Sequence, residues 1–141
     1  MKTIIGNQFP KIVIPLIDQA KSNIDIIIFD WRWYPNSPGA SVQLFNQAIV
    51  RAVRRGVRVR AIVNSNIIQD YLIACGAEAK QLKTKNLVHV KCMILDNKKA
   101  IVGSHNYTQN AFESNLETSI LVDDIDCVYD YFSYFENLWQ S

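Results

Sequence analysis

The stretch that decides the fold runs from residue 89 to residue 106 and is HVKCMILDNKKAIVGSHN. Two apolar runs, 87–95 and 99–102, stand on either side of the polar residues DNKK, which predicts two strands joined by a tight turn. Successive side chains of a strand alternate between its faces, so His89 and Lys91 are expected to point the same way. Two groups able to carry positive charge on one face of an apolar run are unfavourable unless something anionic lies opposite them.

Alternating strands and helices precede this stretch. The residues at 24–30 and 57–63 are continuous apolar runs, typical of strands that are covered on both faces. Helical spacing and closing residues predict helices over three ranges: 8–21, 40–55 and 66–75. Pro15 is expected to kink the first helix or to mark its true start. This strand–helix order favours parallel strands with helices packed on them.

The residues that follow the stretch complete the predicted fold. GSHNYTQNAF, from residue 103, leads into a short helix, 116–123 has the pattern of a strand, and 125–139 predicts a final amphipathic helix. The expected fold class is α/β, with a mixed, mostly parallel sheet flanked by helices on both faces. No repeat, low-complexity tract or linker divides the sequence, so residues 1–141 are predicted to form a single domain.

The composition is that of an ordinary folded globule. Hydrophobic residues make up 49% of the chain and charged residues 20%, which excludes a disordered or fibrous protein, and the net charge of +2 permits an anionic partner without requiring one. Three widely spaced cysteines without a C-x-x-C pair argue against a disulfide framework and fit a reducing compartment. Without a secretory signal pattern or a run of ~18 apolar residues, we expect a cytoplasmic protein with no stable membrane association.

Part of the opening stretch follows the spacing H-x-K-x4-D-x6-G-S-x-N. Its fixed positions are His89, Lys91, Asp96, Gly103, Ser104 and Asn106. The pattern resembles the motif of the phospholipase D superfamily of phosphodiesterases, and so many positions at fixed spacing make the resemblance specific. Glu117 stands where that family places the acidic partner of the histidine. The resemblance covers nearly the whole chain and extends to the family's short bacterial endonucleases.

The resemblance implies a role for most of these residues in phosphodiester chemistry. His89 would attack phosphorus and form a covalent phosphohistidine, which splits one difficult displacement into two easier ones. Lys91 would hold the phosphoryl oxygens, over which negative charge spreads in the transition state. Ser104 and Asn106 would donate hydrogen bonds to the same oxygens.

The other motif residues have supporting or ambiguous roles. Gly103 would let the backbone approach the phosphate closely. Glu117 would accept a hydrogen bond from the second ring nitrogen of His89 and fix its tautomer. Asp96 is a candidate catalytic residue by resemblance, but its neighbours NKK equally suit a turn cap. His105 occupies a variable position to which the family pattern assigns no role.

The leaving oxygen needs a proton, and general-acid assistance contributes roughly 10²–10⁴-fold. Larger family members carry two copies of the motif and use two histidines, whereas this chain has one copy. By resemblance to the short members, we expect a homodimer in which both subunits contribute His89 and Lys91 to one site on the two-fold axis. No metal and no cofactor are expected, because lysine and histidine charges take the place of a divalent ion.

Contacts to the substrate outside the motif are expected from two groups of residues. Lys80, Lys83 and Lys85 lead into the strand of His89, and Lys85 is a candidate for contacts to a nucleic-acid backbone. Trp31 follows the end of a buried strand, where α/β folds bind ligands. Its ring could stack on a base of a single strand, or it could line the dimer seam or the core.

The predicted function is that of a metal-independent phosphodiesterase, most simply a nuclease that hydrolyses DNA or RNA through a phosphohistidine at the interface of a homodimer. One alternative is a phospholipid phosphodiesterase of the phospholipase D type, which would use the same chemistry on another substrate. A second alternative, of another class, is a non-catalytic nucleic-acid-binding module. An intact motif disfavours that second alternative, and the absence of an amphipathic membrane-binding stretch disfavours the lipid substrate.

Overall fold

The two apolar runs of the opening stretch form a hairpin within the sheet. The structure is a computed structural model that describes residues 1–141. Strands β5 (Lys91–Leu95) and β6 (Lys99–Gly103) pair antiparallel, with Cys92 opposite Val102. Asp96 and Asn97 in the connecting turn have φ angles of 55° and 54°, a left-handed conformation that Asp and Asn tolerate better than most residues. The predicted hairpin is therefore confirmed.

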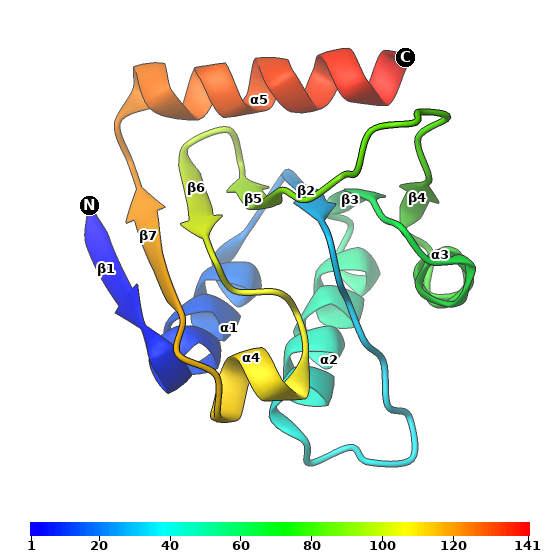
Figure 1. Ribbon diagram of the computed structural model, residues 1–141, viewed down its shortest axis with the longest axis vertical. Helices are drawn as coiled ribbons and strands as arrows, with labels where there is room; N and C mark the ends of the chain where they lie inside the picture. Colours follow the sequence, from blue (N-terminus) through cyan, green and yellow to red (C-terminus); the bar gives the residue numbers. More distant parts are fainter.

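The remaining elements complete a chain of alternating strands and helices (Figure 1). In chain order they are β1 (Lys2–Ile5), the 3₁₀ helix η1 (Gly6–Gln8), α1 (Phe9–Gln19), β2 (Asn23–Ile28), α2 (Ser41–Arg54), β3 (Arg58–Ile62), α3 (Asn66–Ala74), β4 (Glu78–Lys80), then the hairpin, α4 (Gln109–Glu113), β7 (Thr118–Val122) and α5 (Ile125–Gln140). None of these helices combines the length and the apolar character that crossing a bilayer requires.

The strands form one sheet in the order β1-β7-β6-β5-β2-β3-β4. The pairs β2–β3 and β3–β4 are parallel, as their connecting helices predict, and the other four neighbouring pairs are antiparallel. The mixed sheet is confirmed, but the expectation of a mostly parallel sheet is wrong. Its second half is antiparallel: the tight turn of the hairpin forces this for β5 and β6, while β7 returns antiparallel to β6 after a longer connection that contains α4, and β5 pairs antiparallel with β2.

Helices cover both faces of the sheet, as expected (Figure 1). Helices α1 and α2 pack on one face, where Phe9 and Phe45 belong to the larger buried cluster. Helix α5 crosses the other face, and its Val128 and Phe135 are buried in a second cluster that includes Ile27 of β2. Because both faces are covered, the central strands are mostly apolar, and the charged residues Asp25 and Arg60 are buried within them.

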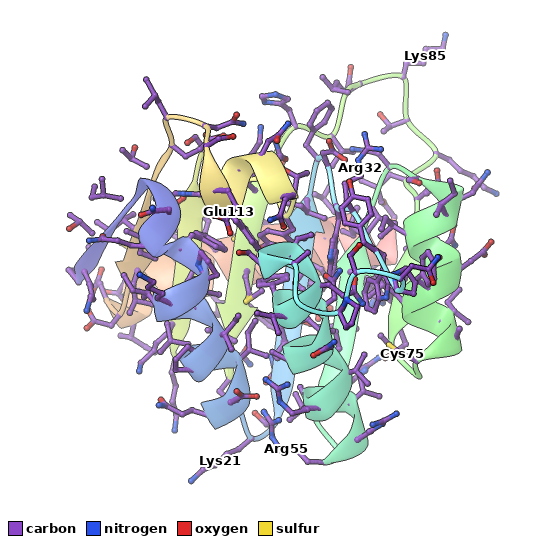
Figure 2. The ribbon with its side chains drawn as sticks, turned by 90° about the horizontal axis from the view of Figure 1, so that it is seen from below. Lys21, Arg32, Arg55, Cys75, Lys85 and Glu113 are labelled. Atoms are coloured by element: carbon purple, nitrogen blue, oxygen red, sulfur yellow. The ribbon has the colours of Figure 1, made fainter.

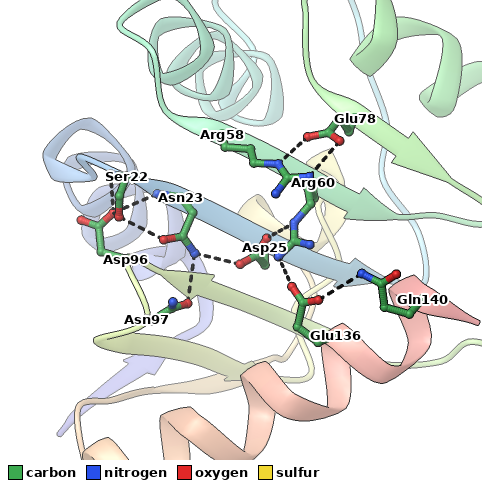
Figure 3. A network of polar contacts seen from close by, with 10 residues as sticks. All are labelled: Ser22, Asn23, Asp25, Arg58, Arg60, Glu78, Asp96, Asn97, Glu136 and Gln140. Atoms are coloured by element: carbon green, nitrogen blue, oxygen red, sulfur yellow. Dashed lines mark hydrogen bonds and ion pairs between the residues drawn. The ribbon is translucent and has the colours of Figure 1, made fainter.

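An ion cluster attaches α5 to the sheet (Figure 3). Arg60 on β3 donates from Nε to Asp25 on β2 at 2.8 Å and from Nη2 to Glu136 on α5 at 2.5 Å. Its guanidinium also lies 4.8 Å from the ring centroid of Phe135. Asp25 is completely buried, so the arginine neutralises a carboxylate that would otherwise be strongly disfavoured in the interior.

Two element boundaries differ from the prediction in ways that matter for the site. The helix expected over 8–21 is η1 followed by α1, and it continues through Pro15, whose ring is exposed. The strand expected over 87–95 begins only at Lys91, since its neighbour β2 ends at the partner residue Ile28 and the chain then turns toward Tyr107. His89 therefore precedes the strand, and its position depends on local contacts.

Candidate active site

The ends of four neighbouring strands bring the motif together at one edge of the sheet. In the ladder, Ile28 at the end of β2 pairs with Lys91 at the start of β5. Next to them, Gly103 at the end of β6 pairs with Ser119 near the start of β7. The residues just beyond these ends, among them His89, Ser104 and Glu117, are consequently neighbours although up to 28 positions apart.

His89 and Lys91 are in direct contact. The Lys91 Nζ lies 3.1 Å from Nε2 and 3.2 Å from Nδ1 of His89, and it donates to the His89 carbonyl oxygen at 2.8 Å. An ammonium group has only donors, so it can hydrogen-bond to only the unprotonated one of these two ring nitrogens, and the tautomer decides which one that is. The ring of Phe29, just after β2, packs at 4.9 Å from the His89 ring and 5.3 Å from Nζ. The structure thus places the His89 imidazole beside a positive charge.

Lys91 has no carboxylate within ion-pair distance, unlike the paired arginines elsewhere in the molecule. Burial lowers the pKa of Lys91, and the charge of Glu117 opposes that shift. A partly desolvated cation without a direct counter-ion is stabilised by an incoming anion. This is the electrostatic environment expected of a phosphate-binding lysine.

Ser104 and Glu117 form a second part of the site. Ser104 Oγ donates to Glu117 Oε1 at 2.6 Å and accepts from the Thr118 backbone N–H at 3.0 Å. Asn115 Nδ2 donates to the other carboxylate oxygen at 3.2 Å. The expected hydrogen bond between Glu117 and His89 is not formed in this structure, and Glu117 acts on the pair through its charge on Lys91.

Asn106 is held by the chain that follows β2. Its Oδ1 accepts from the Asp30 backbone N–H at 3.1 Å, and Tyr107 N–H donates to the Asp30 carbonyl oxygen at 3.0 Å. Because the amide oxygen is engaged, the Asn106 amide is oriented and its Nδ2 is the group left to donate to a ligand. This arrangement fits the expected role of Asn106 as a hydrogen-bond donor.

Gly103 is required by its neighbour strand. A Cβ at this position would overlap Ser119 and lie 2.5 Å from the Thr118 carbonyl oxygen. The glycine therefore allows the close approach of β6 and β7, which brings Ser104 to Glu117. This packing explains why a glycine stands at position 103 without the expected approach of its backbone to phosphate.

Asp96 lies at the other end of β5, away from His89, so the structure corrects its assignment as a catalytic candidate. Its carboxylate accepts from the backbone N–H groups of Lys21, Ser22 and Asn23 at 2.8–3.2 Å. Figure 3 shows Asp96 beside Ser22 and Asn23. Burial raises the pKa of this carboxyl, but these amide hydrogen bonds outweigh it and the pKa is lowered. Asp96 fixes the connection between α1 and β2, which is a structural role, but it caps that distant turn rather than its own.

Of the positions expected for Trp31, the structure shows the core and not a contact with substrate. It is buried, and its Nε1 donates to Asn46 Oδ1 at 2.7 Å. Lys85 remains a candidate contact, since Figure 2 shows it extending from the tip of its loop into solvent.

His105 has a structural role. Its ring is buried against Phe9, with Nδ1 2.7 Å from Ser119 Oγ and Nε2 2.8 Å from the Gly6 carbonyl oxygen. The carbonyl can only accept, so Nε2 carries the proton and Nδ1 accepts from the serine. Burial lowers the pKa of His105, although the hydrogen bond to Gly6 opposes this. Both nitrogens are engaged, so His105 is not available to protonate a leaving group.

Two positioning residues were missed from the sequence. Phe29 supports the His89 ring, and no pattern distinguishes it from other core aromatics. Asn64 Nδ2 donates to the carbonyl oxygens of Phe29 at 3.0 Å and Val88 at 2.9 Å, which ties the residue before His89 to the end of β2. A signal for Asn64 existed, since it follows the carboxyl end of a parallel strand, where α/β folds build their sites.

Comparisons with known proteins agree with this geometry. Residues 13–139 match the family model described as cardiolipin synthase, PLD-like domain. The mitochondrial cardiolipin hydrolase of Xenopus laevis is 28% identical over 143 residues, which cover 94% of this chain but only 61% of that relative, so the chain spans less than two thirds of its length.

Two solved structures share the fold over almost their full length. NucT from Helicobacter pylori has a TM-score of 0.81 at 22% identity, covering 99% of this chain and 95% of that one. Nuc from Salmonella typhimurium, a phospholipase D family member, has a TM-score of 0.82 at 20% identity, covering 99% and 94%. The predicted family and its fold are confirmed, and the chain belongs to the phospholipase D-like family, which comprises phosphodiesterases and related hydrolases.

Proposed function

We propose that this chain is a metal-independent phosphodiesterase that cleaves nucleic acid through a phosphohistidine at a site shared by two copies. The observation that carries the proposal is the contact between Lys91 Nζ and the His89 ring, at an edge where Lys91 has no ion-pair partner and the Asn106 amide is oriented. A nucleophile, a cation and a neutral donor there meet the requirements of phosphoryl transfer.

The first step is an in-line displacement at phosphorus. The unprotonated ring nitrogen of His89 attacks, the bond from phosphorus to the leaving oxygen breaks, and that oxygen takes up a proton. Lys91 and Asn106 Nδ2 stabilise the charge on the remaining phosphoryl oxygens. In the second step water attacks the phosphohistidine and gives a proton to the group that protonated the leaving oxygen, the P–N bond breaks, and the histidine is regenerated.

Within one chain no second histidine can protonate the leaving oxygen, since His105 is buried with both nitrogens engaged. A second copy related by a two-fold axis would supply another His89. A surface for such a copy lies next to the site, where the exposed apolar residues Ile5 and Leu116 border a hollow of about 370 Å³ together with Ser104 and Glu117. We therefore propose a homodimer with the site at its interface.

Nucleic acid is the favoured substrate because lysines are repeated along the segment that leads to His89, as suits a chain of phosphates. The resemblance to short bacterial endonucleases and the full-length match to Nuc and NucT point the same way. The relative named cardiolipin hydrolase keeps a phospholipid substrate as the second candidate. A nucleic-acid-binding module without catalysis is the third.

One substrate panel separates these candidates. Single- and double-stranded DNA, RNA and cardiolipin or phosphatidylcholine vesicles are incubated with the protein, with and without EDTA. We expect hydrolysis of nucleic acid that persists in EDTA and falls by roughly 10³-fold or more in His89→Ala. Lys98→Ala, an exposed lysine at the turn of the central hairpin, is the matched control and should retain activity.

Each other outcome has a definite meaning. Turnover of lipid without turnover of nucleic acid selects the phospholipid alternative. Binding of nucleic acid without turnover selects the binding module. Hydrolysis that EDTA abolishes, or that survives in His89→Ala, would overturn the proposed mechanism.

A further inference from the structure

A lysine-rimmed apolar groove lies directly behind the segment that carries His89. It has a volume of about 350 Å³ and lies between residues 82–90 and the C-terminal half of α5. Its apolar lining consists of Leu82, Leu87, Val88, Val90, Tyr134 and Leu138. Val88 and Val90 flank His89 in the chain, so the groove begins next to the catalytic residue.

The groove is positively charged at its rim. A second hollow of about 430 Å³ continues from it, shares Leu82 and Lys83, and adds Lys80. No aspartate or glutamate side chain lines either hollow. Lys85 extends from the same segment into solvent (Figure 2). Lys83 and Lys85 are therefore available to an anion that follows this segment away from His89, while the ammonium group of Lys80 lies 4.6 Å from the ring centroid of Trp139.

Packing within the chain leaves the outer part of this lining open. Leu87 is 69% exposed and Tyr134 is 52% exposed. An aromatic face and an aliphatic side chain beside lysines suit a ligand with flat apolar groups and repeated negative charges. Thr84 and Asn86 also line the groove and offer groups that hydrogen-bond to base edges. An acyl chain would use the apolar lining but neither these polar groups nor a row of lysines.

We propose that this groove binds the single-stranded segment of nucleic acid that flanks the scissile phosphate, with a base against Tyr134 and phosphates at Lys83 and its neighbours. The inference rests on the proposed function and adds a second contact region to it, on the α5 side of the His89 segment. It implies that substrates long enough to reach the groove bind more tightly than a lone phosphodiester.

The test uses two matched pairs of variants, Tyr134→Ala against Tyr134→Phe and Lys83→Ala against Lys98→Ala. Binding of a fluorescent single strand is measured by anisotropy at several salt concentrations, each variant being made in the His89→Ala background so that the strand is not consumed. We expect Tyr134→Ala to weaken binding roughly fivefold or more, and Tyr134→Phe to preserve it. Lys83→Ala should reduce the slope of log affinity against log salt by about 0.7, and Lys98→Ala should not change it.

Turnover in the His89-containing protein distinguishes failure of the groove from failure of the proposed function. For Tyr134→Ala we expect the ratio of kcat/KM on a long single strand to that on bis(p-nitrophenyl) phosphate to fall by a similar factor. Unchanged binding and an unchanged ratio would overturn the groove assignment even if the nuclease is active. If Tyr134→Ala loses activity on cardiolipin vesicles but still binds the single strand as before, the groove would be assigned to acyl chains instead.

Discussion

Single residues of the motif divide into two groups according to the end of β5 at which they lie. His89 and Lys91 stand at one end, where an anion can reach them, and Asp96 stands at the other, where it accepts backbone hydrogen bonds. Spacing alone cannot separate these roles, since all three are polar residues at fixed positions. The contacts separate them, because a carboxylate surrounded by backbone N–H groups has no free lone pair aimed at a substrate.

Replacing Asp96 by Asn should therefore affect stability more than chemistry. The change keeps the shape and the tolerance of left-handed φ but removes the charged acceptor, so we expect the free energy of unfolding to fall by about 1–3 kcal/mol at neutral pH. The pKa of Asp96 is lowered in the folded protein, so its ionised form stabilises the fold above the ordinary aspartate pKa of about 3.9. That stabilisation is lost as the pH falls through the lower folded-state pKa.

Urea unfolding between neutral and acid pH measures this difference. Asp70→Asn is the control, because Asp70 is exposed on α3 and forms no hydrogen bond through its side chain. The difference in the free energy of unfolding between the parent chain and Asp96→Asn should become smaller at acid pH. A large loss of kcat in Asp96→Asn without loss of stability would restore a catalytic role.

At the scale of elements, α5 is held on the sheet by a buried cation as well as by apolar contacts. Arg60 joins β2, β3 and α5 through Asp25 and Glu136, while Arg58, two residues earlier on the same strand, pairs with Glu78 in solvent. Both arginines thus form ion pairs with carboxylates, Arg60 in the interior and Arg58 at the surface. Since α5 forms one wall of the lysine-rimmed groove, its attachment also supports the proposed binding region.

Arg60→Ala and Arg58→Ala should have very different effects on stability. Removing Arg60 leaves Asp25 buried without its charge partner, and we expect a loss of about 3–5 kcal/mol in the free energy of unfolding. Removing Arg58 breaks an exposed pair, which is worth about 0–1 kcal/mol. Chemical denaturation of both variants beside the parent chain measures the contrast. Equal losses would mean that the Arg60 cluster contributes no more than a surface ion pair.

At the scale of the whole molecule, the arrangement of the site predicts dependence on a second copy. One chain presents a single candidate nucleophile, His89, at an open edge, with exposed Leu116 nearby and no second available histidine. A two-fold axis at this edge would bring two copies of His89 and Lys91 to one phosphate.

Mixing experiments test this directly. When the parent chain is mixed equally with His89→Ala and the subunits exchange, only dimers with two intact histidines should be active, so activity per chain should fall to about a quarter. Light scattering should give twice the chain mass. A monomer that still hydrolyses phosphodiesters, or activity that falls only in proportion to the intact chains, would rule out the shared site.

The sequence by itself predicted the family, the central hairpin and the helices, and it singled out His89 and Lys91 as the candidate catalytic pair, because periodicity, turn chemistry and motif spacing are properties of neighbouring residues. Only the tertiary structure decided the largely antiparallel pairing, the burial of Trp31, the partners of Glu117 and the position of Asp96. These depend on register between distant segments: Asp96 binds Ser22, 74 positions away, and β5 pairs not only with β6, its neighbour in the sequence, but also with the distant β2. Which side chains share an edge is set by that register, since a shift of one residue turns a strand's side chains to the opposite face.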